Sequence, residues 1–473
     1  MILVSLIALP FLAALICAFA RPRAAWSVSF VLSALTLAVG LKAAYVYATG
    51  ASPVTFGTFL RMDALSAFFV VVIAFVNFSA LIYSRSFLEA QRAYYILFNL
   101  FASTMLMVPL LDNLGAMWVA VELTTLVSAF LVGYYNTKTS VEAAWKYLII
   151  CSVGITLALL GTVFFYYAAQ TAGIASLNWS VISAHAAGLD HRMVGIAFLF
   201  ILVGYGTKAG LAPMHTWLPD AHSQALTPVS ALLSGVLLKT SLYAIIRFAI
   251  ITNQVLGPGF SSRLFLLFGL VSVAIAAIFL LVQKDIKRFL AYSSIEHIGI
   301  IVFGLGIGTP LAIFGSLFHI LNHAMAKSLM FFSAGHLVKR YKSHNMHLMK
   351  GAMQALPFAA TAALLGLMAL GGMPPFGMFM SKFIIFAAAF EKGFYWQSAV
   401  LLFFLSLVFG ALVFHLPKVI FGNKPKDVES GKEPFGAKVV FTYIVIFLLI
   451  LGLFMPSCVR GLIESAAKVI TGA

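Results

Sequence analysis

An all-α integral membrane protein with about fourteen transmembrane helices is the fold class that the sequence predicts, and three observations lead to it. Hydrophobic residues make up 62% of the 473-residue chain and charged residues only 9%, whereas soluble domains contain about 25% charged residues. The apolar residues form runs close to the roughly 20 residues that a helix needs to cross a bilayer. No hydrophilic stretch is long enough for a soluble domain, so we expect residues 1–473 to form one polytopic domain.

The individual spans follow from counting apolar runs against that length, with boundaries that are soft by several residues. Arg21 and Arg23 follow the first run instead of preceding it, so we expect a retained span and not a cleaved signal peptide. Residues 47–61 are expected to form an outer loop with a short hairpin. The expected spans are 2–20, 26–46, 62–84, 93–111, 113–134, 144–169, 193–212, 225–250, 262–282, 287–306, 311–338, 355–390, 396–421 and 437–457.

Lys and Arg residues are concentrated in the connections that follow odd-numbered spans. Segments 284–288 and 339–350 are rich in them, whereas the opposite connections hold isolated residues such as Arg192 and Arg263. The positive-inside rule places the basic connections in the cytoplasm and both termini outside the cell's inner (cytoplasmic) membrane, which requires an even number of spans. These connections also account for much of the net charge of +16, so we expect contact with lipid and no nucleic-acid partner.

Glycine and proline interrupt two of the expected spans. The first break lies at 204–219 and contains Pro213, and the second lies at 371–377 and contains Pro374 and Pro375. Proline removes a helix hydrogen bond and clashes with the preceding turn, and a membrane tolerates such breaks only where they are buried or line a cavity. An ordinary proline kink would explain either break alone. Two breaks in the two halves, each near a membrane lysine, favour the site of an inverted-repeat transporter.

Charged and titratable side chains lie near the middle of several apolar runs. A charged group at the bilayer centre costs about 2.5–3.5 kcal/mol on insertion scales. Such residues must face the protein interior or a wet path, and their default interpretation is that they conduct ions or protons. The candidate residues of this path are Glu122, Lys208, His215, Lys239, Glu296, His297, His319, His323, Lys327 and Lys382.

The densest group of these residues begins at Lys208. Further along, Lys239, Tyr243 and Arg247 recur every four residues and so share one helix face. Desolvation and a nearby carboxylate have opposite effects on the proton affinity of a lysine, and Glu122 is the natural candidate for that carboxylate. The alternative for the two lysines is a structural ion pair. Because Arg247 lies near the end of its span, we expect its side chain to reach the membrane interface.

A second group of titratable residues lies on a later span. His319, His323 and Lys327 occur at positions i, i+4 and i+8 and form one stripe. Two histidines four residues apart could bind a metal, but the run lacks a carboxylate or cysteine to complete the site. A proton path fits better because histidine titrates near neutral pH, although a lone histidine is more often a satisfied core residue. Glu296 and His297 lie deeper in their span than the basic residues at 284–288 and are candidates for the inner entry of such a path.

The sequence leaves open the roles of three charged residues. Lys382, just after the second break, fits either a terminal proton site or a lysine near the outer surface. Glu142 and Lys146 lie four residues apart near the start of a span, which fits a local salt bridge within one helix equally well.

The sequence contains no motif for a bound cofactor or metal. Its three cysteines are isolated in apolar surroundings, which argues against an Fe–S centre, a structural zinc or a disulfide framework. It has no GxGxxG loop, Walker loop or zincin motif in a suitable context. We therefore expect no catalytic residue, no metal and no redox cofactor in this chain.

Four segments of the chain form motifs in a recognisable order. They are 61–66 (Arg-Met-Asp-Ala-Leu-Ser), 208–222 (ending in Trp-Leu-Pro-Asp-Ala-His), 291–294 and 372–382. These motifs resemble those of the antiporter-like subunits shared by respiratory complex I, Mrp-type sodium/proton antiporters and membrane-bound NiFe hydrogenases. The resemblance spans nearly the whole chain and is specific, because the motifs are long and occur in the expected order.

The resemblance implies roles for several of the buried residues. Glu122 and Lys208 would form the ion pair of a first half-channel, and Lys239 would be the bridging lysine. The stripe from His319 to Lys327 would belong to a central hydrophilic axis. Lys382 would be the exit-side group of a second half-channel.

The resemblance also implies an architecture and a function. It implies fourteen helices in two inverted five-helix repeats, at approximately 93–250 and 262–421, with two broken helices. Within the family, Tyr-Ser-Ser-Ile-Glu-His at 292–297 looks most like the hydrogenase-4 and formate hydrogenlyase type. The modest length, without a C-terminal extension or long lateral helix, argues against the complex I subunit that carries one.

We therefore expect a non-catalytic, proton-translocating subunit of a membrane redox complex, with sodium linkage also open. Its expected partners are other membrane subunits of the same superfamily and a peripheral redox arm with Fe–S and NiFe subunits. The alternative is an Mrp-type cation/proton antiporter subunit that works without electron transfer. A scaffold whose titratable groups no longer conduct is disfavoured, because every charged position expected from the family is filled.

Overall fold

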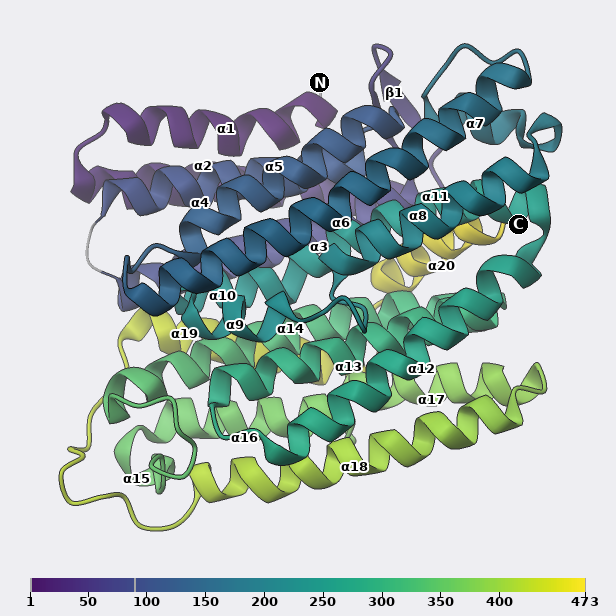
Figure 1. The fold of residues 1–473 in the computed structure, drawn as a ribbon. Helices are drawn as coiled ribbons and strands as arrows, with labels where there is room; N and C mark the ends of the chain where they lie inside the picture. Colours follow the sequence, from purple (N-terminus) through teal and green to yellow (C-terminus); the bar gives the residue numbers. More distant parts are fainter. Residues whose placement is uncertain (1, 89–90, 473) are drawn as a thin grey trace.

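The computed structural model describes residues 2–88 and 91–472, which form a bundle of long helices running side by side (Figure 1). Within these residues, 12 helices are long and apolar enough to cross a membrane. They are α1 (Ile2–Phe19), α2 (Pro22–Ala48), α3 (Ala64–Phe87), α4 with the 3₁₀ turn η1 (Arg92–Leu110), α5 (Leu114–Val132), α6 (Lys138–Thr171), α8 (His191–Ala209), α10 to α11 (Thr227–Leu256), α12 (Pro258–Val282), α13 (Ile286–Ile307), α18 (Tyr395–Ile420) and α19 (Phe435–Leu453).

Two more of the expected spans are helical but are rich in polar residues or broken. α14 (Pro310–Tyr341) has 32 residues and carries the stripe of histidines and lysine. The expected span 355–390 consists of two half-helices, α16 (Pro357–Gly371) and α17 (Gly377–Glu391), which flank the Gly-Pro-Pro break. The predicted fold class, an all-α membrane protein with about fourteen spans and broken helices, is therefore confirmed.

Both breaks begin at a glycine in a left-handed backbone conformation. Helix α8 ends before Gly210, which has φ +79°, and α16 ends before Gly372, which has φ +75°. Glycine adopts this conformation without the steric penalty of a side chain, which makes it the usual residue at a helix C-terminus. The prolines then prevent the helix from resuming at once, so each break is a short non-helical segment inside the bundle.

The chain from α4 to α11 and the chain from α12 to α18 occupy adjacent parts of the bundle, coloured blue to teal and green in Figure 1. Helix α14 packs against α13, α16 and α17 in its own part, and against α10 and the π-helical turn η3 (Leu233–Leu237) in the other. It therefore connects the two halves, whose inverted-repeat relation remains a prediction. The span facing it consists of α10 (Thr227–Leu232), the π-helical turn η3 (Leu233–Leu237) and α11 (Leu238–Leu256).

Several helices begin at a polar residue whose side chain caps the first turn. Asp63, Asn113, Asp190 and Asp285 each accept a hydrogen bond from a backbone N–H group of the helix that follows. Loss of such a cap costs about 1 kcal/mol. These caps lie at the ends of spans, where the backbone N–H groups would otherwise have no partner in the membrane.

Short elements connect or flank the spans. The expected hairpin is present as β1 (Val54–Phe56) and β2 (Leu60–Met62), which pair antiparallel. Helix α20 (Ser457–Thr471) follows the last span and packs against α2, α3 and α14. The remaining elements are α7 (Trp179–Ala184), η2 (Ala186–Gly188), α9 (Trp217–Gln224) and α15 (Ala352–Ala355).

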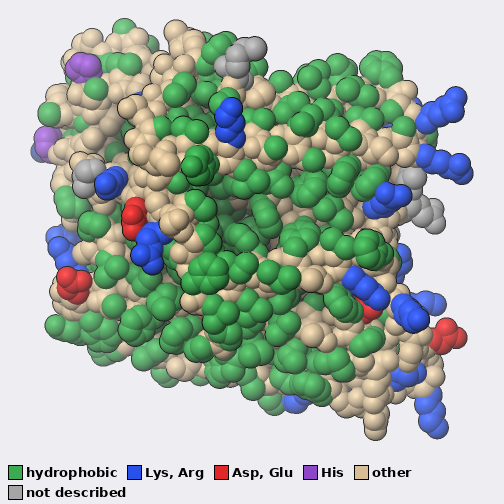
Figure 2. Space-filling view, turned by 180° about the vertical axis from the view of Figure 1, so that it is seen from behind, with side chains coloured by type: hydrophobic (Ala, Val, Ile, Leu, Met, Phe, Trp, Pro, Cys, Tyr) green, Lys and Arg blue, Asp and Glu red, His purple; other side chains and the backbone are tan. Residues whose placement is uncertain are grey.

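The surface shows the charge distribution expected of a membrane protein. In the view of Figure 2, hydrophobic side chains form a broad belt, while Lys and Arg gather at the two ends and more densely at one of them. The richer end corresponds to the left of Figure 1, where the loop at 421–434 lies. Following the predicted orientation, we call this the inner end and the opposite one the outer end.

Candidate functional site

Nearly all of the predicted path residues lie inside the bundle. Lys208, Lys239 and Lys327 are at most 1% exposed, and burial of this kind in a bilayer requires compensating polar contacts. The contacts divide the residues into three groups, at the first break, at the π-helical turn and at the second break. The fully or almost fully buried members are Lys208, Lys239, Glu296, His297, His319, His323 and Lys327, and His215 is 6% exposed.

The first group surrounds Lys208, which lies in the last turn of α8 beside the break. Its ammonium donates a hydrogen bond to Thr125 Oγ1 at 2.8 Å and another to the Tyr147 hydroxyl. It also lies 4.5 Å from the centre of the Tyr147 ring. The Tyr147 hydroxyl is in turn 2.7 Å from Ser128 Oγ. Helices α5, α6 and α8 thus hold this lysine through neutral hydroxyl groups.

Glu122 lies on α5 close to this lysine but does not contact it. One carboxylate oxygen accepts a hydrogen bond from Ser152 at 2.8 Å, and the other is buried without a hydrogen-bond partner among the described residues. Within the same residues, no ion pair joins Glu122 to Lys208. Instead, Thr125, one helical turn from Glu122, accepts a hydrogen bond from the Lys208 ammonium. The pair that the family resemblance implies is therefore not closed in this conformation.

The second group lies where the π-helical turn η3 at the start of α11 meets α13 and α14. Lys239 donates to the carbonyl of Ser234, which belongs to the π-helical turn η3. π-helical turns inside α-helices occur frequently at functional sites. Lys327 donates to the carbonyl of Leu290 at 2.7 Å, and Ser234 Oγ is 2.7 Å from Ser294 Oγ. Both lysines are thus held by backbone carbonyls and not by carboxylates.

The third group lies beside the second break. Glu296 is fully buried and forms an ion pair with Lys382, whose Nζ is 3.6 Å from Oε1. His297 Nε2 is 3.4 Å from the other oxygen of Glu296, and its Nδ1 is 3.0 Å from His319 Nε2. His319 Nδ1 is 2.9 Å from Ser381 Oγ. Glu296 and His297 thus lie deep in the bundle, as expected, and the structure places them beside the second break; their role at the entry of a path remains a prediction.

Lys382 contacts both Glu296 and the end of the half-helix before the second break. Its side chain is 15% exposed, and its ammonium donates to the carbonyl of Leu370, at the end of α16, at 3.4 Å. Lys382 is therefore an internal residue with some exposure. Lys382 lies on α17, shortly after the break, and from this neighbouring helix its ammonium approaches the carboxylate of Glu296.

His323 and His215 have fewer protein contacts than the other members. The ring of His323 lies 4.8 Å from that of His297, but neither of its nitrogens has a hydrogen-bond partner among the described residues. His215 lies in the first break, with its ring centre 6.3 Å from that of Tyr292. Metal binding by the histidines finds no support, since no cluster of three or more His, Cys, Asp or Glu suitable for a metal occurs in the described chain.

The sequence prediction for Arg247 is wrong. Its side chain does not reach the interface but is 4% exposed and pairs with Asp63 at 2.6 Å. Lys287 lies in the first turn of α13, at the end that we expected at the inner side, but its side chain is buried and donates to the carbonyl of Ala225 at 2.8 Å. In both cases a partner from a distant part of the chain satisfies the charge, which makes burial possible. The helical spacing placed Arg247 on the same helix face as Lys239, but nothing in the neighbouring sequence identified Asp63 as the partner of Arg247.

His222 also joins the interior, although sequence reasoning did not include it in the path. It is fully buried, and its Nδ1 lies 2.9 Å from the carbonyl of Leu218. Its position at the end of the motif at 208–222 was the only signal for it.

An open polar pocket lies at the inner end of the first group. Its volume is about 370 Å³. Asp220 pairs with Arg288 at 2.8 Å and with Lys146 at 3.5 Å, and Lys146 also pairs with Glu142 at 2.7 Å as its helical spacing predicts. These charged groups line the pocket next to the broken helix.

A second inner contact fixes the start of α13. Asp285 caps this helix through the N–H groups of the next residues, at 2.8 and 2.9 Å, and lies 3.3 Å from His344 Nδ1. Burial alone would raise the pKa of the Asp285 carboxyl, but its hydrogen bonds to His344 and to the backbone hold that pKa below the ordinary value. The capped end thus positions the helix that carries Glu296.

Comparison with known proteins agrees with the resemblance seen in the motifs. Residues 111–410 match the family described as NADH:quinone oxidoreductase/Mrp antiporter, transmembrane. The chain is 38% identical over 385 residues to a hydrogenase-4 component F homolog of Methylacidiphilum infernorum, covering 78% of this chain and 81% of the relative. It is 32% identical over 349 residues to hydrogenase-4 component B of Escherichia coli, covering 70% of this chain and about half, 51%, of that longer relative.

Solved structures contain chains of the same fold. The membrane-bound sulfane sulfur reductase, an archaeal respiratory membrane complex, contains a chain that matches with a TM-score of 0.89 and 25% identity, covering 99% of this chain and 98% of that one. A chain of the Mrp complex from a Dietzia species matches with a TM-score of 0.90 over 99% of this chain and 97% of that one, but at 21% identity this likeness shows the fold alone. With its matched family region and its hydrogenase-4 relatives, the chain belongs to the NADH:quinone oxidoreductase/Mrp antiporter family and is an antiporter-like membrane subunit of the complex I, Mrp and hydrogenase group.

Proposed function

We propose that this chain translocates protons as a non-catalytic subunit of a hydrogenase-type redox complex in the cell's inner membrane. The observation that carries the proposal is the row of buried titratable residues, which falls into three groups, the first and the last of them beside the two broken helices. The row begins with Lys208 beside the first break, passes Lys239 and Lys327, and ends with the Glu296–Lys382 pair beside the second. Such groups in a membrane interior are costly, and their default role is in ion or proton pathways.

The chemistry of the row favours protons over metal cations. Lys208, Lys239 and Lys327 present ammonium groups as hydrogen-bond donors, and a protonated lysine repels a metal ion while it can give up a proton. The histidines beside Glu296 add groups that titrate near neutral pH. Sodium linkage would require an oxygen-lined site, for which the row offers one deeply buried carboxylate, that of Glu296.

The path begins at the inner pocket beside Asp220, which opens next to the helix that follows the first break. From Lys208 a proton passes to Lys239 and then, through Lys327, to the histidines and Lys382. Movement of the Lys208 ammonium from Thr125 towards Glu122 would change its proton affinity, since opposite charges interact strongly in a low-dielectric interior. The open state seen here, in which Glu122 keeps one oxygen without a partner, supports such a switch.

The energy for this switch must come from other subunits. The relatives are components of multi-subunit membrane complexes, and two of them are hydrogenase-4 components. We infer that the partners are further membrane subunits of this family and a peripheral arm with Fe–S and NiFe subunits. The charge distribution supports the proposed orientation, with both termini outside.

The runner-up is an Mrp-type cation/proton antiporter subunit without electron transfer. The Mrp chain shares the whole fold, so the architecture does not separate the two functions. Purification of the native complex does: nickel and Fe–S subunits in the preparation support the hydrogenase type. Mrp-like partners without these metals would support the antiporter instead.

Replacement of Lys239 by Ala tests the path itself. We expect the Lys239→Ala complex to assemble but to lose the proton gradient that the wild-type complex generates in sealed vesicles, measured with a pH-sensitive dye. Lys392→Ala, at an exposed lysine outside the row, is the matched control and should pump normally. Normal pumping by an assembled Lys239→Ala complex would rule out the proposed path.

A further inference from the structure

A cluster of charged and aromatic side chains closes the outer end of the helix face that carries Lys239. Arg247 lies on α11 about two helical turns beyond Lys239. Its Nη2 donates to Asp63 Oδ1 at 2.6 Å and to Ser66 Oγ at 3.1 Å. Its Nε donates to the Tyr243 hydroxyl at 2.8 Å. Three partners on two helices therefore clamp this guanidinium in one position.

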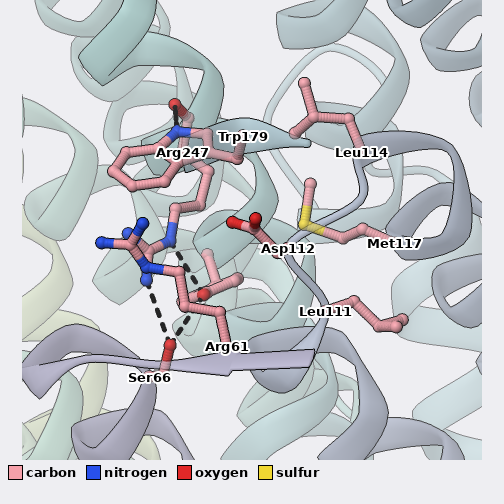
Figure 3. Close-up of a pocket in the computed structure, with 9 residues that line it drawn as sticks. Arg61, Ser66, Leu111, Asp112, Leu114, Met117, Trp179 and Arg247 are labelled. Carbon is pink, nitrogen blue, oxygen red and sulfur yellow. Dashed lines mark hydrogen bonds between the residues drawn. The ribbon is translucent and has the colours of Figure 1, made fainter. Parts of the chain in front are cut away.

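Trp179 and Arg61 complete the cluster (Figure 3). The Trp179 ring centre lies 4.5 Å from Cζ of Arg247 and 5.0 Å from Cζ of Arg61. Asp112 lines the same cavity, but its carboxylate accepts hydrogen bonds from the N–H and hydroxyl of Ser180 at 3.2 and 2.5 Å. The space left for the centre of a water molecule is only about 10 Å³, which is room for roughly one water.

The cluster around Arg247 differs in two respects from the residues of the row. A proton relay needs groups that both accept and release protons, whereas the arginine side chain stays protonated in proteins. A chain of waters could bypass such a group, but a cavity for one water gives it no continuous route. At the inner end, by contrast, the pocket beside Asp220 is about 370 Å³. The relay along α11 thus reaches Arg247 and stops.

The geometry points to Arg247 as a seal that, held by Asp63 and Tyr243, prevents protons on Lys239 from leaving along α11 to the outer end. Protons must then pass sideways to Lys327 and the histidines, and leave beside the second break. The inference rests on the proposed function for the path that the seal protects. It adds a residue whose task is to block a leak and not to carry a proton.

Arg247→Lys is the most direct test, because it keeps the positive charge but introduces a group that can release its proton. The measurement is passive proton flux in proteoliposomes that hold the purified complex without redox substrate, under an imposed pH gradient. We expect flux several-fold above that of the wild-type complex. Arg263→Lys, the same change at an exposed arginine of α12, should leave the flux unchanged. Wild-type flux in an assembled Arg247→Lys complex would overturn the inference.

Asp63→Asn provides a second variant should the first fail to assemble. Asparagine still caps α3, but it removes the charge that holds Arg247. We expect a smaller rise in passive flux than for Arg247→Lys, and an assembled complex without any rise would contradict the seal.

The double variant Lys239→Ala/Arg247→Lys separates a specific leak from a damaged structure. If the leak runs along α11, loss of Lys239 should return the flux to the wild-type value. A double variant that leaks as much as Arg247→Lys would show that the protons bypass this face, which overturns the seal. The proposed function fails by a different result, namely normal pumping by Lys239→Ala alone.

Discussion

Neutral hydroxyl and carbonyl groups, and not carboxylates, hold the lysines of the row. Lys208 contacts Thr125 and Tyr147, whereas Lys239 and Lys327 donate to backbone carbonyls. A strong buried ion pair would fix the charge of each lysine, because breaking such a pair leaves an uncompensated charge. Weaker neutral acceptors stabilise the ammonium while leaving the proton free to move. Only Lys382 has a carboxylate partner, at 3.6 Å.

Tyr147→Phe should therefore impair pumping more than it impairs folding. The change removes one of the two acceptors of the Lys208 ammonium and leaves Thr125 in place. Loss of one buried hydrogen bond costs about 1–3 kcal/mol, a modest fraction of the stability of a large bundle. Proton pumping in vesicles and thermal unfolding in detergent measure the two effects. Tyr167→Phe, at a tyrosine that is 54% exposed, is the control, and equal pumping by both variants would contradict the role assigned to Tyr147.

The titratable residues of the row could be predicted from the sequence, whereas most of their partners could not. A lysine such as Lys239 in an apolar run stands out because its insertion is costly. Thr125, Ser152 and Tyr147 carry no such signal, since hydroxyl groups are common in membrane helices. For the same reason the sequence suggested Glu122 as the partner of a lysine, although the structure places a threonine there.

At the level of helices, close contacts between backbones position the row. Helices α6 and α8 approach each other closely at Gly204, where an added Cβ would lie 2.4 Å from the backbone N of Ala158. Glycine is required there because no other residue leaves room for the neighbouring backbone. Lys208 lies one turn further along α8, so this crossing sets its distance from α5 and α6.

Gly204→Ala should force α8 away from α6 and displace Lys208. Overpacking of this kind typically costs about 1–3 kcal/mol, so we expect a lower unfolding temperature in detergent and weaker pumping. Gly259→Ala is the matched control because nothing lies within 4 Å of its added Cβ. If the two variants unfold at the same temperature, the crossing is not as tight as the backbone distance indicates.

Asp285 gives α13 a stability that depends on pH. Because its folded-state pKa lies below the ordinary value, the ionised carboxylate stabilises the fold above the ordinary pKa of about 3.9. This contribution is lost as the pH falls through the lower folded-state value. Unfolding temperatures of wild type and Asp285→Asn in detergent should differ most near neutral pH and converge in acid. A difference that stays constant with pH would show that the charge is not responsible.

Helix breaks could be predicted from glycine and proline, but the π-helical turn could not. The prolines at 213, 374 and 375 prevent a continuous helix, because proline removes a helix hydrogen bond and clashes with the preceding turn. The turn at 233–237 contains residues that suit an α-helix, apart from Gly235. Gly235 lies close to Val76 and Ser328 on neighbouring helices, and such tertiary contacts leave no local pattern in the sequence.

At the scale of the whole molecule, the two ends of the first half differ in openness as well as in charge. The inner end has a polar pocket beside the first break, while the cluster around Arg247 closes the outer end of the same half. A path that opens at both ends at once would dissipate the gradient. The asymmetry therefore suits a device that loads protons at one side of the first half and passes them across the bundle to the second.

Cysteine labelling tests the orientation on which this directionality depends. Cys458 is the only exposed cysteine of the described chain, so its replacement by serine gives a background for single cysteines. Thr55→Cys lies in the exposed outer hairpin, and Glu429→Cys lies in the exposed loop at 421–434. The positive-inside rule predicts that a membrane-impermeant maleimide labels Thr55→Cys in intact cells and labels Glu429→Cys only after the membrane is opened. The reverse pattern would invert the molecule in the membrane, and protons loaded at the pocket beside Asp220 would then come from outside the cell.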